Sequence, residues 1–535
     1  MLRCLRRWPV GLANCRCRGF VLLRPPSRTA ATTPLSPWSP SGAWVLTRPQ
    51  PPRSFTRLHL STPAGAASDR DRTCRRLFPA PLQSHLNCML HFATGLVAAG
   101  VHVTFLHTDH NLRRIDPSAG APTTPRLRFL SVPDGLPDDH PRSVDGISEL
   151  MESLWTEASV AYRALLAKLC APRVSDNDAV DDGFPPVTCV VADGIMPFAI
   201  DIAEELGVPA IAFRTASACS FLAYLSVPRL VELGELPFPD GADLDEPVRG
   251  VPGMESFLRL RDLPVQCRSF TNTHQDPLLR MVVESSAHSR KARALVFNTA
   301  PSLERSALEH IKPQMRDVFT IGPLHAACPA PAAASSLLRT DDGILPWLDT
   351  QADRSVVYVS LGSLAVISDE QFTEFLSGLV AAGHPFLWVL RPDMAGASQD
   401  AALREAIATV REDKARVVAW APQRDVLRHR AVGWNSTLEA AVEGMPMVCW
   451  PFFADQQVNS RFVGAVWRTG LDMKDVCDRA VVQKMVREAM ESGEIRASAQ
   501  GLADQVRNDI AGEGSSAKEF RRLVQFIKEL SIKNE

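Results

Sequence analysis

The 535-residue sequence lacks a run of about 18 consecutive apolar residues, which argues against a membrane-spanning helix. Its formal charge of -2 leaves little net charge for bulk binding to nucleic acid or to an anionic membrane surface. None of the twelve cysteines forms a Cys-x-x-Cys pair, which argues against a zinc or thioredoxin-like site. The G-x-G-x-x-G, Walker A and H-E-x-x-H patterns are absent too, so nicotinamide, P-loop and zinc-protease interpretations lack support.

The N-terminal segment lacks charge of one sign. Residues 1–68 contain ten Arg and ten Pro but no Lys, Asp or Glu, so they carry +10 and the rest of the chain carries -12 (-2 minus 10). This composition resembles an organelle transit peptide, but it also suits a disordered leader or a misplaced translation start, because its proline clusters interrupt helices. We expect a cytoplasmic protein, with a plastid or mitochondrion as the alternative if the leader directs import.

The body of the chain alternates two patterns. Short β-branched runs are apolar at consecutive positions, which is typical of strands buried on both faces of a parallel sheet. These runs are His102–Thr108, Val187–Ala192, Pro209–Phe213, Ala294–Asn298, Ser355–Ser360, Pro385–Leu390, Arg416–Ala419 and Pro446–Trp450. Helical patterns lie between them, and several stop at a glycine: Leu86–Ala99, Met196–Leu206, Glu370–Ala382 and Ser436–Glu443. The alternation predicts an α/β protein with doubly wound parallel sheets.

Two sheet domains fit the pattern better than one, because a new strand–turn–helix series begins at Ser355 after a segment rich in Pro, Ala and Ser. Phe520–Leu530 places its apolar residues on one helical face, which predicts a helix that packs back on a domain. The predicted divisions are a basic leader at 1–74, a first domain at 75–325, a linker at 326–351, a second domain at 352–510 and a C-terminal helix at 511–535.

Candidate site residues lie where predicted strands end, since ligands bind beyond the carboxyl ends of parallel strands. His85 stands at a strand-to-helix junction and could act as a general base, or it could be a packed or capping residue. Asp193 ends an apolar strand and could orient a histidine, or it could cap the following helix. Gly362-Ser363 could bring backbone N–H groups to a phosphate, or it could be an ordinary turn.

The stretch from Trp420 to Gln456 contains Trp420-Ala421-Pro422-Gln423, then Trp434-Asn435-Ser436-Thr437-Leu438-Glu439, and ends with Asp455-Gln456. It resembles the donor-binding signature of plant family-1 UDP-glycosyltransferases, and the resemblance extends from Leu77 to about Leu530. The segment Val132–Arg142 resembles the branch that includes iridoid (deoxyloganetic acid-type) glucosyltransferases. The resemblance implies a GT-B fold, in which two Rossmann-like domains face each other across a cleft.

The resemblance also implies the chemistry. The first domain would receive a small, partly apolar acceptor and the second would hold UDP-glucose as co-substrate, with no metal and no other cofactor. His85 matches the family's base and Asp193 the carboxylate that pairs with it. Trp420 would stack on uracil, the Ala421 backbone would bind the base, and Gln423 and Glu439 would reach the ribose. Ser363, Asn435 and Ser436 would meet the diphosphate, and Trp434, Asp455 and Gln456 would bind the sugar.

The sequence departs from the family in one place. Trp420 to Gln456 spans 37 residues counted inclusively, seven fewer than the signature, and the gap lies between Gly433 and Trp434. The family has x-Phe-x-Thr-His-Cys-Gly there, which forms a buried strand and supplies a histidine to the phosphates. From the resemblance as a whole, we expect an inverting hexosyltransferase that acts on a hydroxyl or carboxyl group of its acceptor. The alternatives are a relative that keeps the fold but only binds acceptor or partner, and a nucleotide-binding scaffold.

Overall fold

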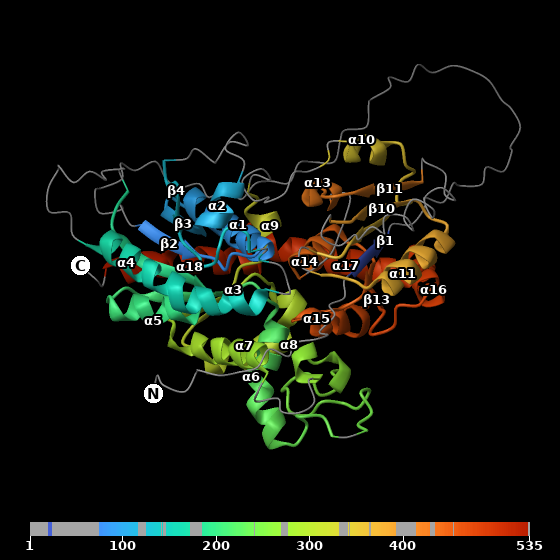
Figure 1. The fold of residues 1–535 in the computed structure, drawn as a ribbon, viewed down its shortest axis with the longest axis horizontal. Helices are drawn as coiled ribbons and strands as arrows, with labels where there is room; N and C mark the ends of the chain where they lie inside the picture. The colour runs from blue at the N-terminus through green and yellow to red at the C-terminus, as the bar shows by residue number, and fades with distance from the viewer. Residues whose placement is uncertain are drawn as a thin grey trace, which may run out of the picture.

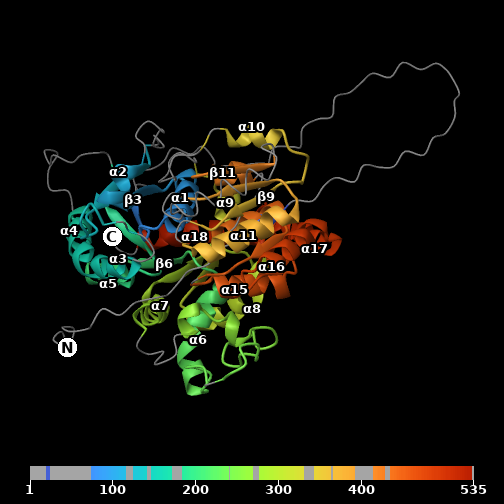
Figure 2. The ribbon, with the colours of Figure 1, turned by 45° about the vertical axis from the view of Figure 1, so that its right-hand side comes forward.

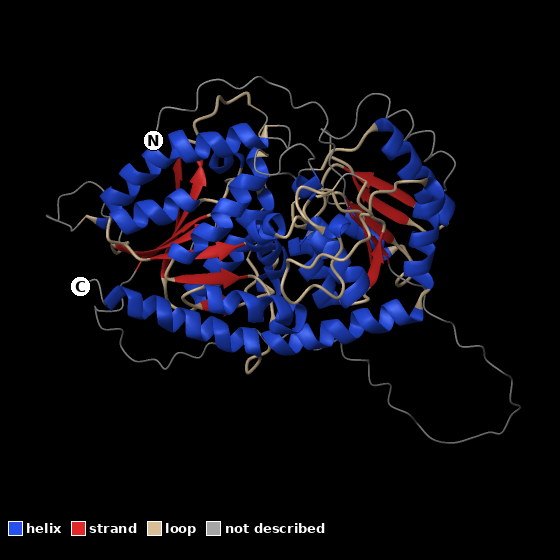
Figure 3. Cartoon of the chain, turned by 90° about the horizontal axis from the view of Figure 1, so that it is seen from below, coloured by secondary structure: helices blue, strands red, loops and turns tan. Residues whose placement is uncertain are grey.

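The structure is a computed structural model. It describes residues 20–23, 74–115, 125–140, 142, 146–171, 184–239, 241–268, 276–330, 341, 343–362, 365–391, 414–427, 434–452 and 454–532. Within these ranges it consists of two α/β sheet domains, which lie side by side with helices around each sheet (Figure 3). No helix of the described part is both long and apolar enough to cross a bilayer.

The first domain is built on a seven-stranded sheet in the order β4-β3-β2-β5-β6-β7-β8, in which every neighbouring pair is parallel. Its strands are β2 (Cys74–Phe78), β3 (His102–Thr108), β4 (Leu127–Val132), β5 (Val187–Asp193), β6 (Ala210–Arg214), β7 (Ala294–Phe297) and β8 (Val318–Thr320). The chain adds β3 and β4 on one side of β2, then starts again on the other side with β5. The switch point therefore lies between β2 and β5, where a doubly wound sheet binds its ligand.

Helices connect these strands. They are α1 (Gln83–Ala98), α2 (Asp109–Arg114), α3 (Ile147–Ser153), α4 (Ser159–Cys170), α5 (Pro197–Glu205), α6 (Ala218–Glu232), α7 (Pro277–His288), α8 (Pro301–Ile311) and α9 (Leu324–Ala327). All five residues of β6 are buried, as consecutive apolar positions predict for an inner parallel strand.

The second domain has a six-stranded sheet in the order β11-β10-β9-β1-β12-β13. Five strands come from the expected region: β9 (Val357–Ser360), β10 (Phe386–Val389), β11 (Ala415–Val418), β12 (Met447–Cys449) and β13 (Gly470–Asp472). Its helices are α10 (Ile344–Asp349), α11 (Asp369–Ala382), α13 (Gln423–Leu427), α14 (Trp434–Glu443), α15 (Gln456–Arg461), α16 (Arg479–Glu491) and α17 (Gly493–Ile510). Gly383 ends α11 with φ +81°, the left-handed conformation that the glycine after this helix predicts.

The sixth strand comes from the leader. β1 (Phe20–Leu23) pairs with both β9 and β12, and Figure 1 shows it in dark blue among the yellow and orange elements of the second domain. A disordered leader was one interpretation of the composition, and within this segment Phe20–Leu23 form a strand. The physical reason is pairing on both sides, which a composition-based interpretation does not consider. Cys74, the last residue assigned to the leader, begins β2.

The last helix, α18 (Ser515–Ile532), returns to the first domain. Phe520, Leu523 and Ile527 are buried in the same core as Leu77 and Phe92. The ring of Phe520 meets that of Phe92 edge to face, with 6.2 Å between centroids, and Arg75 Nη2 donates to the Ile527 carbonyl over 2.8 Å. Figures 1 and 2 both show α18, in dark red, among the blue and green elements of the first domain.

Candidate active site

His85 and Asp193 lie in contact at the switch point of the first sheet. His85 stands in the first turn of α1, which follows β2, and Asp193 is the last residue of β5. The His85 Nδ1 atom is 2.6 Å from Asp193 Oδ2. The His85 side chain keeps 16% of its surface exposed, whereas Asp193 keeps 1%. A buried carboxylate thus holds one ring nitrogen of a histidine that solvent can still reach.

Backbone groups fix the Asp193 carboxylate. Ala80 N donates to Oδ2 over 3.1 Å and Ile195 N donates to Oδ1 over 3.2 Å. Burial by itself raises the pKa of Asp193, but the His85 charge and hydrogen bond, with the two backbone donors, outweigh it and lower the pKa below its usual value. Asp193 is therefore an anion at neutral pH. It favours the tautomer in which His85 carries its proton on Nδ1 and leaves Nε2 as a base.

Two neighbours from the end of β6 were not predicted. Thr215 Oγ1 lies 3.0 Å from His85 Nδ1 and 3.5 Å from Nε2. The buried Arg214 donates from Nη1 to the Gly194 carbonyl over 2.6 Å, and its Nη2 donates to Ser286 over 3.1 Å. Burial lowers the pKa of Arg214 to about 10, which still leaves it charged at neutral pH. The strand-end rule that singled out Asp193 applies equally to Arg214-Thr215 and could have found them.

In the second domain, the structure brings together two of the predicted ribose-binding residues. Gln423 begins α13 and Glu439 lies on α14, and Gln423 Nε2 donates to Glu439 Oε2 over 3.1 Å. Glu439 is buried, so its carboxylate is held among neighbouring elements rather than in bulk solvent. Trp420 is half-buried beside the buried Ala421 at the end of β11, and both belong to one apolar cluster. All four residues come from the segment between β11 and β12.

Asp455 and Gln456 lie where the two domains touch. Ser220 of α6 donates its hydroxyl to the Asp455 carbonyl over 3.3 Å, and Asn459 donates to the Asp455 carboxylate over 2.9 Å. Burial raises the pKa of Asp455, and the nearby His85 charge partly opposes that shift. Gln456 Oε1 accepts the Phe452 N–H over 2.7 Å. Asp455 therefore lies at a contact between the domains, and its charge interacts with that of His85.

The remaining predicted donor-site residues are the three at the start of α14 and Ser363 after β9. Ser363 lies outside the described residues, and for Trp434, Asn435 and Ser436 the structure gives the backbone of the first turn of α14 but no side chains. Gly362, just before Ser363, has φ +76°, and the buried Arg391 donates to its carbonyl. Among the side chains that are described, no three His, Cys, Asp or Glu gather as metal ligands would, and metal-free transfer stays an expectation.

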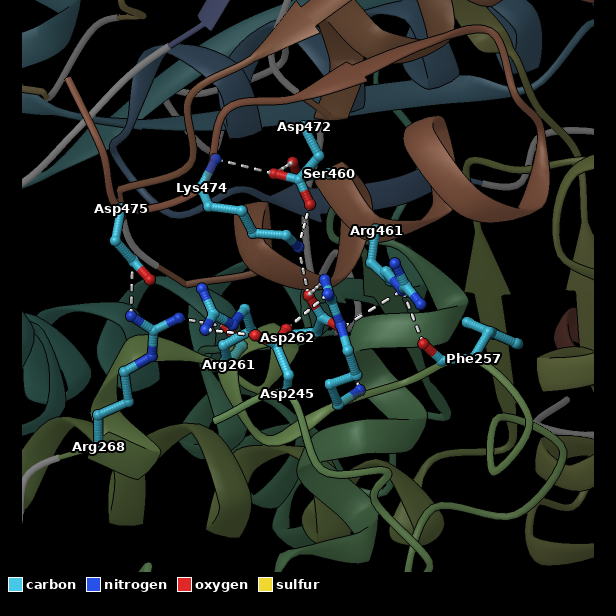
Figure 4. Close-up of polar contacts among 11 residues, drawn as sticks. Asp245, Phe257, Arg261, Asp262, Arg268, Ser460, Arg461, Asp472, Lys474 and Asp475 are labelled. Carbon is cyan, nitrogen blue, oxygen red and sulfur yellow. Dashed lines mark hydrogen bonds and ion pairs between the residues drawn. The ribbon is translucent and has the colours of Figure 1, made fainter. Parts of the chain in front are cut away.

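A cluster of charged side chains also joins the two domains, and its member Arg461 ends α15, the helix that begins at Gln456. We call Asp245, Arg259, Arg261, Asp262, Arg268, Arg461, Asp472, Lys474 and Asp475 the interdomain charge cluster (Figure 4). Asp262 of the first domain is fully buried at its centre and pairs with Arg259 and with Lys474 of the second domain. Burial raises the pKa of Asp262, but these cations outweigh it and lower the pKa. The cluster therefore fixes one domain against the other.

Comparison with known proteins adds the following. A family model described as UDP-glucoronosyl and UDP-glucosyl transferase matches residues 303–491. The chain is 43% identical over 469 residues to a myricetin 3-O-rhamnoside 1,2-glucosyltransferase from Crocosmia x crocosmiiflora, which covers 85% of this chain and 96% of that protein. It is 38% identical over 480 residues to a 7-deoxyloganetic acid glucosyltransferase from Catharanthus roseus, covering 85% of this chain and 97% of that protein.

Solved structures agree on the architecture. A UDP-glucose: anthocyanidin 3-O-glucosyltransferase in complex with UDP superposes with a TM-score of 0.71 at 23% identity, over 86% of this chain and 99% of that one. The Os79 protein of O. sativa in complex with UDP superposes with a TM-score of 0.68 at 25% identity, over 84% and 99%. The predicted fold class, two Rossmann-like sheets in the GT-B arrangement, is confirmed.

Proposed function

The chain belongs to the plant family-1 UDP-glycosyltransferases, and on that premise we propose that it transfers a hexose, glucose in our expectation, from a UDP-sugar to a hydroxyl or carboxyl of a small, partly apolar specialised metabolite. Transfer would invert the anomeric centre. The observation that carries the proposal is the 2.6 Å contact between His85 Nδ1 and Oδ2 of the buried Asp193. The charge of His85 also interacts with the Asp455 carboxylate.

The residues divide the reaction between them. An acceptor hydroxyl is a weak nucleophile at neutral pH, so His85 Nε2 takes its proton as the oxygen attacks the anomeric carbon. The bond from that carbon to the β-phosphate oxygen breaks, and UDP leaves with the electron pair. Asp193 stabilises the positive imidazolium that forms and keeps the ring oriented. A carboxyl acceptor arrives already ionised and needs less from His85.

The donor half supports the proposal through the Gln423–Glu439 pair. Glu439 offers two acceptor oxygens, which suits the paired hydroxyls of a ribose. We assign Trp420 and Ala421 to the uracil, Ser363, Asn435 and Ser436 to the diphosphate, and Trp434, Asp455 and Gln456 to the sugar. The relatives in Crocosmia and Catharanthus are named as glucosyltransferases, which favours a glucose donor.

One observation favours a second candidate, a relative that keeps the fold but binds without transfer. α13 is followed along the chain by α14, and only residues 428–433, which lie outside the described part, separate them. In the family a strand and a phosphate-contacting histidine belong there. Loss of one such contact costs about 2.7–4 kcal/mol of barrier by analogy with an oxyanion donor, enough to slow transfer about 100- to 1,000-fold.

The test is transfer from UDP-glucose to a panel of small hydroxyl- and carboxyl-bearing acceptors, measured as glucoside by mass spectrometry. His85→Ala should abolish transfer and leave UDP affinity nearly unchanged. The control is His310→Ala, because His310 is exposed on α8 and bonds only within its own helix turn in the described contacts. A large loss of UDP binding in His85→Ala would contradict the assigned role. UDP binding without transfer in the unaltered protein would favour the binding relative.

We expect the activity in the cytoplasm, with a plastid or mitochondrion as the alternative. Import of the full chain into isolated chloroplasts, followed by cleavage of the leader, would support the alternative. Absence of cleavage would favour the cytoplasm.

A further inference from the structure

The centre of the second sheet is occupied by a strand from the other end of the chain. β9 and β12 both pair with β1. Val21 lies opposite Val359 on one side and opposite Val448 on the other. Both pairings are antiparallel, whereas every other neighbouring pair in this sheet is parallel. β1 therefore enters a parallel sheet from outside its βα series.

The path of the chain explains why a position is open there. In a doubly wound sheet a strand follows each helix, yet after β11 the chain forms α13 and α14 before β12. Leu427 and Trp434 are separated by six residues, an ordinary length for a direct helix–helix connection. Among the described residues, the series thus reaches β12 one strand short. The position left between β9 and β12 is the switch point of this sheet, where β1 lies.

The strands beside β1 need a partner. With β1 in place, Val357, Val359, Met447 and Cys449 are each 0% exposed, so the three paired strands lie in the interior of the domain. Unpaired N–H and C=O groups in such a place lose their hydrogen bonds to water without replacement. An extended segment with hydrogen-bonding groups on both edges satisfies both strands at once.

The sequence of β1 fits that position. Phe20-Val21-Leu22-Leu23 is apolar at four consecutive positions, as expected for a strand covered on both faces, and Arg18 and Arg24 bracket it in a leader otherwise rich in Arg and Pro. Its four residues match the four of β9. Because the segment is part of the same chain, its pairing is intramolecular and has a high effective concentration.

We propose that Phe20–Leu23 is a substitute strand, which completes the second sheet in place of the strand missing from its βα series. The leader then has a structural role in the donor half of the protein. β9 leads into the Gly362 turn, and the chain reaches β12 from α14, so both flank the proposed diphosphate contacts. The inference concerns the sheet itself and holds whether or not the chain transfers sugar.

Hydrogen–deuterium exchange on the full-length protein tests the proposal directly. The amides of residues 20–23 should exchange at least about 100-fold more slowly than an unstructured peptide, as amides of a core strand do. Val21→Pro removes a ladder donor from a central strand, so peptides covering β9 and β12 should exchange faster. Ala31→Pro, a matched change in the leader outside β1, should have no such effect. Exchange of residues 20–23 at the unstructured rate, with β9 and β12 still protected, would overturn the proposal.

Two further variants keep the test decisive if Val21→Pro fails to fold. Phe20 lies opposite Cys449, so Phe20→Cys should form a disulfide with it under mild oxidation, whereas Leu22→Cys, opposite Met447, should not. Inserting seven residues of the pattern x-Phe-x-Thr-His-Cys-Gly between Gly433 and Trp434 should displace β1. Residues 20–23 should then lose protection while β9 and β12 keep it. Equal cross-linking of both cysteine variants, or unchanged protection after the insertion, would refute the substitute-strand role.

Discussion

Replacing Asp193 by Asn separates the charge of this residue from its shape. The carboxylate accepts from Ala80 N and Ile195 N and holds His85 Nδ1 at 2.6 Å. An amide cannot replace both oxygens: when its oxygen keeps the Ile195 N–H, its NH₂ group takes the place of Oδ2 and faces His85 Nδ1. The ring would move its proton to Nε2, which removes the base that an acceptor hydroxyl needs.

The expected magnitude follows from losing both the tautomer and the stabilised imidazolium. A wrong-tautomer base in a comparable triad costs about 10⁴ in kcat, and each factor of ten corresponds to about 1.4 kcal/mol. We therefore expect Asp193→Asn to lower kcat by about 10³- to 10⁴-fold, or about 4–5.5 kcal/mol of barrier. UDP affinity should change little, because Asp193 contacts first-domain groups.

Two measurements check this. Initial rates with UDP-glucose and the best acceptor give kcat, and ¹⁵N NMR of histidine-labelled protein, assigned with His85→Gln, reports which ring nitrogen carries the proton. The second measurement needs no turnover, so it applies even if the chain only binds its ligands. Unchanged nitrogen shifts in Asp193→Asn, or a rate within twofold of the parent protein, would refute the assignment of Asp193 as the orienting group.

Three other predictions follow from the contacts described above. Glu439→Gln should weaken UDP binding about 10- to 100-fold in calorimetry, since hydrogen bonds to a charged group contribute about 1.5–3 kcal/mol; unchanged affinity would remove Glu439 from the ribose site. Asp262→Asn should lower the free energy of unfolding in urea by about 3 kcal/mol, because it removes the buried carboxylate that pairs with the partly exposed Arg259 and Lys474, whereas the half-exposed Asp245→Asn should cost under about 1 kcal/mol. Folding lowers the pKa of Asp262, so its contribution to the free energy of unfolding is present above the unfolded pKa of about 3.9 and is lost as the pH falls through the folded pKa. The difference in unfolding free energy between the parent protein and Asp262→Asn should therefore shrink in acid. A difference that stays constant with pH would argue against the pairing. Phe520→Ala should lower the free energy of unfolding by about 3–5 kcal/mol in the same urea assay. Phe526→Ala, at a partly buried position, should lower it less. Equal losses in the two variants would contradict a stabilising role for the contact between Phe520 and Phe92.

Sequence patterns recovered the strands with long apolar runs, including the edge strand β11, and missed several short or partly exposed ones. β5 and β6 are buried at nearly every position, so their apolar runs are unbroken and easily recognised. β4 is partly exposed at four of its six positions and includes Arg128 and Ser131, and β8 has only three residues, so neither shows that pattern. β1 could not be found at all, because its neighbours in the sheet are hundreds of residues away.

The candidate site divides in a similar way. A strand-end rule singled out Asp193, and the family resemblance added the donor residues. Neither could place Thr215 Oγ1 3.0 Å from His85, since that distance depends on how β6 packs beside β5. The interdomain charge cluster was also out of reach, because Asp262 and Lys474 lie 212 residues apart and meet only when both domains are folded.

A segment near each end of the chain packs in the more distant domain: β1 in the second sheet and α18 in the core of the first domain. This arrangement determines when each domain can be completed during translation. α18 supplies Phe520, Leu523 and Ile527 to the core of the first domain. The other buried residues of that core have all been translated once Ala330 is added. At about 5–20 residues per second, a ribosome needs about 10–40 s to pass from Ala330 to Phe520. Over that interval the nascent first domain exposes apolar surface, and β1 stays unpaired until β9 and β12 emerge. The first domain cannot be finished before the second has been translated, so a chain truncated after α17 would have an open first-domain core.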